Sequence, residues 1–101
     1  LIMDINSTNT LVVNQLNKDL LLCGFSLHID ASSSDHLFIQ ILMEFLSHER
    51  QNNLEKLTHF FYRIDLAENQ INNLHDMDVE ELTYLVLNRL KKKVIFRSNF
   101  K

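Results

Sequence analysis

The sequence contains no proline, a single glycine and a single cysteine among its 101 residues. Folds rich in β-strands need many tight turns, which draw on glycine and proline, so their scarcity favours helices joined by polar turns. One cysteine, Cys23, excludes a disulfide bond within these residues and fits a reducing compartment. One glycine excludes a glycine-rich phosphate-binding loop.

Long apolar runs are also missing. No stretch approaches the roughly 18 consecutive apolar residues of a membrane span, and the first residues, with Asp4 and no basic cluster, do not resemble a secretory signal. Hydrophobic residues make up 46% of the chain and charged residues 23%, as in ordinary soluble domains. We therefore expect one cytoplasmic domain over residues 1–101, large enough for a single core.

The charges are unevenly distributed along the chain. Residues 1–88 hold all 13 acidic side chains and four basic ones, a net charge of −9, whereas residues 89–101 hold six basic side chains and no acidic one, a net charge of +6. Such an asymmetry indicates either a basic segment for an acidic partner or a segment that binds the acidic remainder of the same chain or of a second copy.

Apolar residues at helical spacing predict an all-α fold, a compact bundle of about five helices with short loops. The expected helices cover residues 9–22, 36–50, 54–63, 66–74 and 79–93. Residues 25–29, FSLHI, alternate apolar and polar, which fits a short strand or an extended connector. Residues 94–101 either continue the last helix or form an apolar tail.

Turn and capping residues mark the expected ends of these helices. Gly24 provides the stop of the first helix, because glycine adopts the left-handed conformation found after helix ends. Residues three apart fit an N-cap and its third-position partner at the starts of the second, fourth and fifth helices. These pairs are Ser32 with Asp35, Asp65 with Glu68, and Asp78 with Glu81.

The stretch FFYRIDLAENQ, residues 60–70, places an arginine and an aspartate close together among apolar residues. One interpretation is a buried Arg63–Asp65 pair at a functional site. The other is a corner, in which Arg63 points away from the apolar stripe and Asp65 caps the next helix. Because buried charges are rare and need partners, we favour the corner.

Two helices carry more apolar surface than one contact needs. Eight of the ten residues from Leu37 to Leu46 are apolar, and the last helix is apolar over more than half its circumference. This surplus predicts a non-enzymatic protein-interaction or self-associating protein, most simply a homodimer. The candidate interface residues are Leu37, Phe38, Phe45, Tyr84 and Leu87.

The alternative function is association with nucleic acid through the basic segment 89–101. Basic side chains neutralise phosphates, and the nearby Phe96 and Phe100 could stack on bases. The candidate residues are Arg89, Lys91, Lys92, Lys93 and Arg97. Two observations favour a structural role instead: cations complement the dipole at a helix C-terminus, and a sequence pI of about 5.9 opposes long-range attraction to nucleic acid.

Catalytic and metal-binding patterns are weak. No two of the five histidines (His28, His36, His48, His59 and His75) are three or four residues apart, as zinc sites require. Asp76, Asp78, Glu80 and Glu81 resemble the start of a calcium loop, but Glu81 occupies the position that needs glycine. Cys23 lies on an apolar helix face, where core cysteines are common. We therefore expect no enzyme, metal or cofactor.

Two stretches, FYRIDLAENQI and EELTYLVLNRLKKKVIFR, together resemble the C-terminal half of a group of small bacterial proteins of unknown function. In that group a Tyr-Arg-Ile-Asp segment is followed by a helix with a basic, apolar end. The resemblance covers about residues 57–97. It implies a bacterial, cytoplasmic, all-α protein, and it carries no activity, cofactor or partner.

Overall fold

The prediction of an all-α fold is confirmed. The computed structural model describes the backbone of residues 2–99 and the side chains of residues 10–97, and this part of the chain contains helices and no strand. Its elements are α1 (Ile2–Leu22), α2 (Asp35–Asn52), α3 (Leu54–Arg63), α4 (Glu68–Asn72), the 3₁₀ turn η1 (Leu74–Asp76) and α5 (Val79–Asn99). Residues 25–29 form an extended connector.

α1 is longer than the periodicity predicted, and α5 follows the option in which the residues after 93 continue the last helix. α1 begins at Ile2 rather than at residue 9, because neither proline nor glycine interrupts the preceding residues. α5 continues past residue 93 to Asn99, since Val94 is still buried and holds this part of the helix against the core. The predicted helix 66–74 is instead the five-residue α4 followed by η1.

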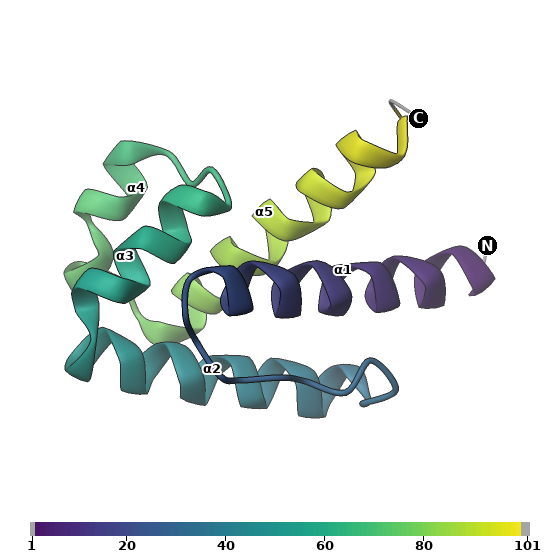
Figure 1. Ribbon diagram of the computed structural model, residues 1–101, viewed down its shortest axis with the longest axis horizontal. Coiled ribbons are helices and arrows are strands. Elements are labelled where there is room, and N and C mark those ends of the chain that lie inside the picture. Colours follow the sequence, from purple (N-terminus) through teal and green to yellow (C-terminus); the bar gives the residue numbers. More distant parts are fainter. Residues whose placement is uncertain (1, 100–101) are drawn as a thin grey trace.

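α1 and α2 run in the same direction, which a short turn cannot achieve (Figure 1). The connecting residues 23–34 travel back alongside the helices before α2 begins. α5 crosses behind α1 in the opposite sense, and it contacts both α1 and α2. α3 packs on α1 and α2 at the end where α4 and η1 turn the chain toward α5. α5 therefore has one face in the bundle and the rest of its surface outside.

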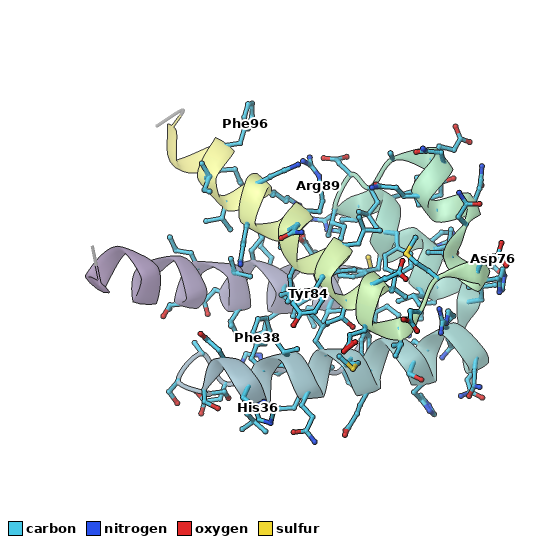
Figure 2. All side chains as sticks on the ribbon, turned by 180° about the vertical axis from the view of Figure 1, so that it is seen from behind. His36, Phe38, Asp76, Tyr84, Arg89 and Phe96 are labelled. Atoms are coloured by element: carbon cyan, nitrogen blue, oxygen red, sulfur yellow. The ribbon has the colours of Figure 1, made fainter. Side chains whose placement is uncertain are left out.

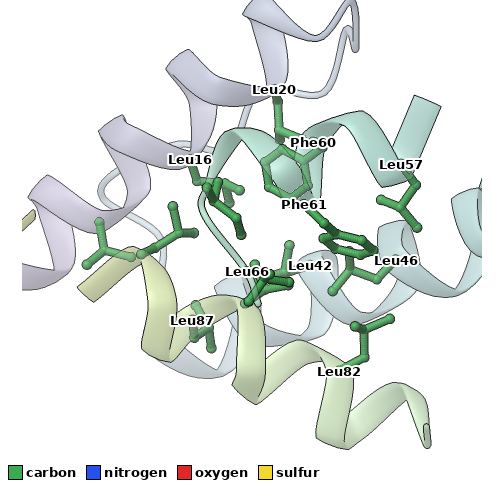
Figure 3. Packing of buried hydrophobic residues seen from close by; sticks show 14 of the residues in the cluster. Leu16, Leu20, Leu42, Leu46, Leu57, Phe60, Phe61, Leu66, Leu82 and Leu87 are labelled. Atoms are coloured by element: carbon green, nitrogen blue, oxygen red, sulfur yellow. The ribbon is translucent and has the colours of Figure 1, made fainter. Parts of the chain in front are cut away.

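The hydrophobic core lies where these helices meet (Figure 3). Phe60 and Phe61 of α3 are fully buried neighbours, with ring centroids 5.8 Å apart. Leucines from the other long helices complete this layer: Leu16, Leu20, Leu42, Leu46, Leu82 and Leu90. Burying side chains of this size stabilises the fold by about 1.5–3 kcal/mol each.

Two helices end in the same left-handed turn. After α1, Gly24 has φ +86°, and the Phe25 and Gly24 amides donate to the Leu20 and Leu21 carbonyls at 2.9 and 3.0 Å. After α3, Asp65 has φ +64°, and the amides of residues 66 and 65 donate to the carbonyls of residues 61 and 62. Both are Schellman motifs. The Gly24 stop is confirmed.

The predicted roles of Asp65 and Ser32 as N-caps are wrong. Asp65 ends α3, and α4 begins three residues later at Glu68. The N-cap of α2 is Ser34, whose hydroxyl accepts a hydrogen bond from the Leu37 amide at 3.2 Å. Ser32 instead donates to the Asp30 carboxylate. In each case a competing local hydrogen-bond pattern occupies the predicted residue, and the N-cap lies two residues further along, at Ser34 and Ala67.

Polar side chains fix the connector and the turn before α5. The Asn17 side chain pairs with both backbone groups of Ile29, donating to its carbonyl at 2.8 Å and accepting from its amide at 2.9 Å. Arg50 donates to the Leu74 and Met77 carbonyls. Because buried backbone groups need partners, these bonds stabilise the extended connector and the turn before α5, where regular α-helical hydrogen bonding is absent.

Candidate functional site

A fully buried carboxylate, Asp19, joins α1, α3 and α5. Its relative exposure is 0%. Arg63 donates from Nε at 3.0 Å, Lys93 from Nζ at 3.1 Å, and Gln15 from Nε2 at 3.1 Å. Two cations and an amide therefore compensate the desolvation of one carboxylate. The sequence carried a signal for this residue, since Asp19 follows Leu16 by three positions on the apolar face of α1.

The Arg63–Asp65 pair considered from the sequence does not form. Arg63 pairs with Asp19, whereas the Asp65 carboxylate faces the Arg89 guanidinium at 3.7 Å. Arg89 also donates from Nε to the Ile64 carbonyl at 2.8 Å. The stretch is a corner, as predicted, but its two charged residues bind different helices.

A groove lies beside this cluster, between the second half of α5 and the turn after α3. Figure 2 labels two of its lining residues on α5, Arg89 and Phe96. Its volume is about 540 Å³. We call it the basic groove, and its lining residues are Asp65, Arg89, Lys92, Lys93, Phe96 and Arg97. Among the described residues, four cations thus face a single lining carboxylate, with an aromatic ring toward the end of α5.

The structure gathers most of the predicted nucleic-acid residues in this groove. Lys91 is the member of that set that does not line it. Three of the others are also tied to the chain itself: Arg89 to residues 64 and 65, Lys93 to Asp19, and Arg97 to the Gln15 side chain at 2.9 Å. Part of the basic segment therefore docks on the body of the same chain, one of the outcomes its charge indicated.

A second surface of α5 faces solvent along the length of the helix. We call it the outer stripe; it consists of Glu80, Glu81, Tyr84, Asn88, Lys91 and Ile95, all exposed. Tyr84 lies in its acidic half with 49% of its surface exposed (Figure 2). A shallow hollow of about 430 Å³ at the acidic end is lined by Asp78, Glu80, Glu81, Tyr84, Leu85 and Asn88.

The predicted interface residues separate into exposed and covered ones. Leu37 on α2 and Tyr84 on α5 are 46% and 49% exposed. Phe38 and Leu87 are buried in the core, and Phe45 packs edge-to-face on Phe25 with ring centroids 5.0 Å apart. The connector and the neighbouring helices cover these three side chains within the chain, so their apolar character is explained without a second copy.

Within residues 10–97, Cys23 and the acidic side chains form no further chemical cluster. Burial raises the pKa of the Cys23 thiol above its ordinary value, and the nearby Arg63 guanidinium opposes this only in part. Among the side chains that the structure describes, no group of three His, Cys, Asp or Glu residues is placed to hold a metal ion. Over the same described residues, none of the helices has the length and apolarity to cross a bilayer.

Comparison with known proteins gives no relative: no family model, no curated protein sequence and no solved structure is similar to this chain. The two solvent-facing surfaces of α5, the basic groove and the outer stripe, are therefore the structural features that bear on its function.

Proposed function

We propose that the protein is a small non-enzymatic interaction protein that self-associates through the outer stripe of α5. The observation that carries this proposal is the order of charges on one exposed helix face. Glu80 and Glu81 lie at the start of the stripe, and Lys91, with Lys92 at its edge, lies near the end. A face that is acidic at one end and basic at the other is complementary to its own antiparallel copy.

The spacing of these residues supports a specific register. Eleven residues separate Glu80 from Lys91 and Glu81 from Lys92, which is about three helical turns, so the members of each pair lie on the same side of the stripe. A two-fold axis at the level of Val86 brings Glu80 to within one residue, about 1.5 Å along the helix, of the level of Lys91 of the second copy. Glu81 and the second copy's Lys92 are offset by the same amount in the opposite direction.

The centre and ends of this pairing are also compatible. Tyr84 meets Asn88 of the second copy, which offers an amide to the phenol or its ring. The exposed Ile95 meets the partly buried Met77 of the second copy. The hollow beside Glu80 and Tyr84 gives room for an incoming lysine side chain.

This pairing is expected to be weak and sensitive to salt. Exposed ion pairs contribute about 0–1 kcal/mol each, and one helix on one helix makes an interface at the small end of specific complexes. We therefore expect a monomer–dimer equilibrium visible at protein concentrations up to about 100 μM.

Charge exchange tests the register directly. Glu80→Lys and Lys91→Glu should each weaken self-association, because each brings like charges together in the homodimer. Mixing the two variants should restore association, since every such pair is again opposite in charge, and so should the double variant E80K/K91E. Sedimentation equilibrium at low salt measures all four samples.

Glu55→Lys is the matched control. Glu55 is an exposed acid in the first turn of α3, so its reversal has the same unfavourable effect on a helix N-terminus but lies outside the stripe. It should leave self-association unchanged. A wild-type protein that stays monomeric up to about 100 μM would exclude this function, and a mixture that fails to recover would exclude the register.

A further inference from the structure

The basic groove combines four cationic side chains with an exposed aromatic ring, Phe96, and this combination is absent from the outer stripe as defined above. We propose that it binds a phosphate group joined to a flat aromatic ring, as found in nucleotides and in single-stranded nucleic acid. The lining of this site faces the turn after α3, and Lys92 is the lining residue that also lies at the edge of the outer stripe.

The cations of the groove retain capacity for an anion. Of these cations, Lys93 is already compensated by the buried Asp19 carboxylate at 3.1 Å. Arg89 uses Nε on a carbonyl and has only a long 3.7 Å contact to Asp65, so its guanidinium still has donors available. Lys92 makes no ion pair within the described residues, and it is exposed.

These donors suit a phosphate better than a carboxylate. Arg89, Lys92 and Arg97 approach from positions three to eight residues apart on one helix, so they can reach several oxygens of one group or of two neighbouring groups. The Asp65 carboxylate marks the opposite wall, where an amino group of a base could donate to it. The groove volume of about 540 Å³ falls within the range of small-ligand sites.

Phe96 provides the surface for the ring. It lines the groove with 63% of its surface exposed, and it projects from the second half of α5 (Figure 2). Aromatic side chains beside cations bind single strands by stacking on bases while the cations neutralise phosphates. The net charge of the chain is −3, so attraction at long range is weak and binding must depend on these local contacts.

Two adjacent lysines provide a matched test. Lys92 lines the groove, whereas Lys91 lies on the outer stripe. Fluorescence anisotropy with a labelled single-stranded oligonucleotide of about 10 nucleotides measures binding at low salt. Lys92→Gln and Arg97→Gln should each weaken binding about fivefold and lower its salt dependence. Lys91→Gln should leave the affinity within about twofold, as expected for a residue outside the contacts.

Competition experiments and one further variant identify the source of the phosphate and the role of the Phe96 ring. ATP that competes with the oligonucleotide indicates a nucleotide site, and competition by unlabelled oligonucleotide alone indicates a nucleic-acid site; both support the proposal. Phe96→Ala should weaken binding at least fivefold. Inorganic phosphate competing as well as ATP would overturn the role of the ring.

Two results would overturn the site itself. One is the absence of binding to any of these probes. The other is an equal loss with Lys91→Gln and Lys92→Gln, because that would reflect the overall field of α5 rather than the groove. Since Lys91→Gln also weakens the proposed self-association, it separates any loss caused by dissociation of a dimer from loss of the groove contacts.

Discussion

At the scale of single residues, the turn before α2 is held by hydrogen bonds of short polar side chains, each of which bonds a different group. The Asp30 carboxylate accepts two hydrogen bonds from Ser32, from its amide at 2.9 Å and its hydroxyl at 2.8 Å. Ser34 then caps α2. Serine and aspartate form these local bonds readily, which is why they are common both in turns and at helix starts.

The pKa of Asp30 provides a test of this turn. The bond from the Ser32 amide, and then that from its hydroxyl, lower the pKa of the Asp30 carboxyl below its ordinary value. The carboxylate therefore stabilises the fold above its unfolded-state pKa, and this stabilisation is lost as the pH falls through the lower folded-state pKa. Ser32→Ala should raise the folded-state pKa part of the way back. Carbon-detected NMR titration of Asp30 measures it.

Ser33→Ala is the control for that titration. Ser33 bonds to Asp30 through backbone groups alone, its amide donating to the Asp30 carbonyl at 3.0 Å. Its substitution should leave the carboxyl pKa unchanged. An equal shift in both variants would mean that the loop conformation, rather than the hydroxyl, sets the pKa.

At the scale of helices, the ends of α1 and α3 use one geometry with different residues. Gly24 has no Cβ and adopts φ +86° at little cost, whereas Asp65 adopts φ +64° with a side chain. In both turns the residue after the left-handed position, Phe25 or Leu66, is buried. The hydrophobic contact that accompanies a Schellman motif therefore holds Asp65 in a conformation that its own preference opposes.

The two turns should respond in opposite directions to substitution. Gly24→Ala should lower the free energy of unfolding by about 1 kcal/mol, because its Cβ disfavours a positive φ. The new Cβ would also lie 3.3 Å from Lys56 Cε, a flexible atom. Asp65→Gly should raise the free energy of unfolding by about 0.5 kcal/mol, and the exposed pair with Arg89 contributes little against this.

Urea unfolding of both variants measures the difference. Asp65→Ala is the informative companion, since it loses the carboxylate as Asp65→Gly does but keeps a Cβ. It should be less stable than the wild type. If Asp65→Gly were destabilising by as much as Asp65→Ala, the carboxylate rather than the backbone conformation would determine stability at this corner.

At the scale of the whole molecule, one carboxylate connects three helices that are distant in sequence. Asp19 receives Arg63 from α3 and Lys93 from α5. Gln15 extends this network by bonding both Asp19 and Arg97. The basic end of the chain is thereby held against α1, and the groove and the outer stripe of α5 are set on two different sides of that helix.

Removing this carboxylate charge should destabilise the whole fold. Asp19→Asn should lower the free energy of unfolding by about 2 kcal/mol, less than for a fully buried pair, because Arg63 and Lys93 side chains remain 39% and 18% exposed to water. Urea unfolding followed by circular dichroism measures it. Asp76→Asn removes the same charge from an exposed position and should change stability by less than about 0.5 kcal/mol.

Local features of the fold were predictable, and contacts between helices were not. The bounds of α3, 54–63, and the stop at Gly24 follow from short-range spacing and from the conformational freedom of glycine. The burial of Phe38 and Leu87 could not be assigned from periodicity, because an apolar face looks the same whether its cover is the same chain or another. The cations of the basic groove were predicted as candidate residues from the sequence, but the position of Asp65 opposite them was not.

The sequence by itself determined that this is a helical protein with a basic end, because periodicity, the absence of proline and the order of charges are properties of neighbouring residues. Only the tertiary structure decided that α1 and α2 are parallel and that Asp19 is buried between cations. It also decided that one side of α5 forms the basic groove and another the outer stripe, which is acidic at one end and basic at the other. These features depend on which helix faces which. That choice is made by the packing of side chains far apart in the chain, where no local preference acts.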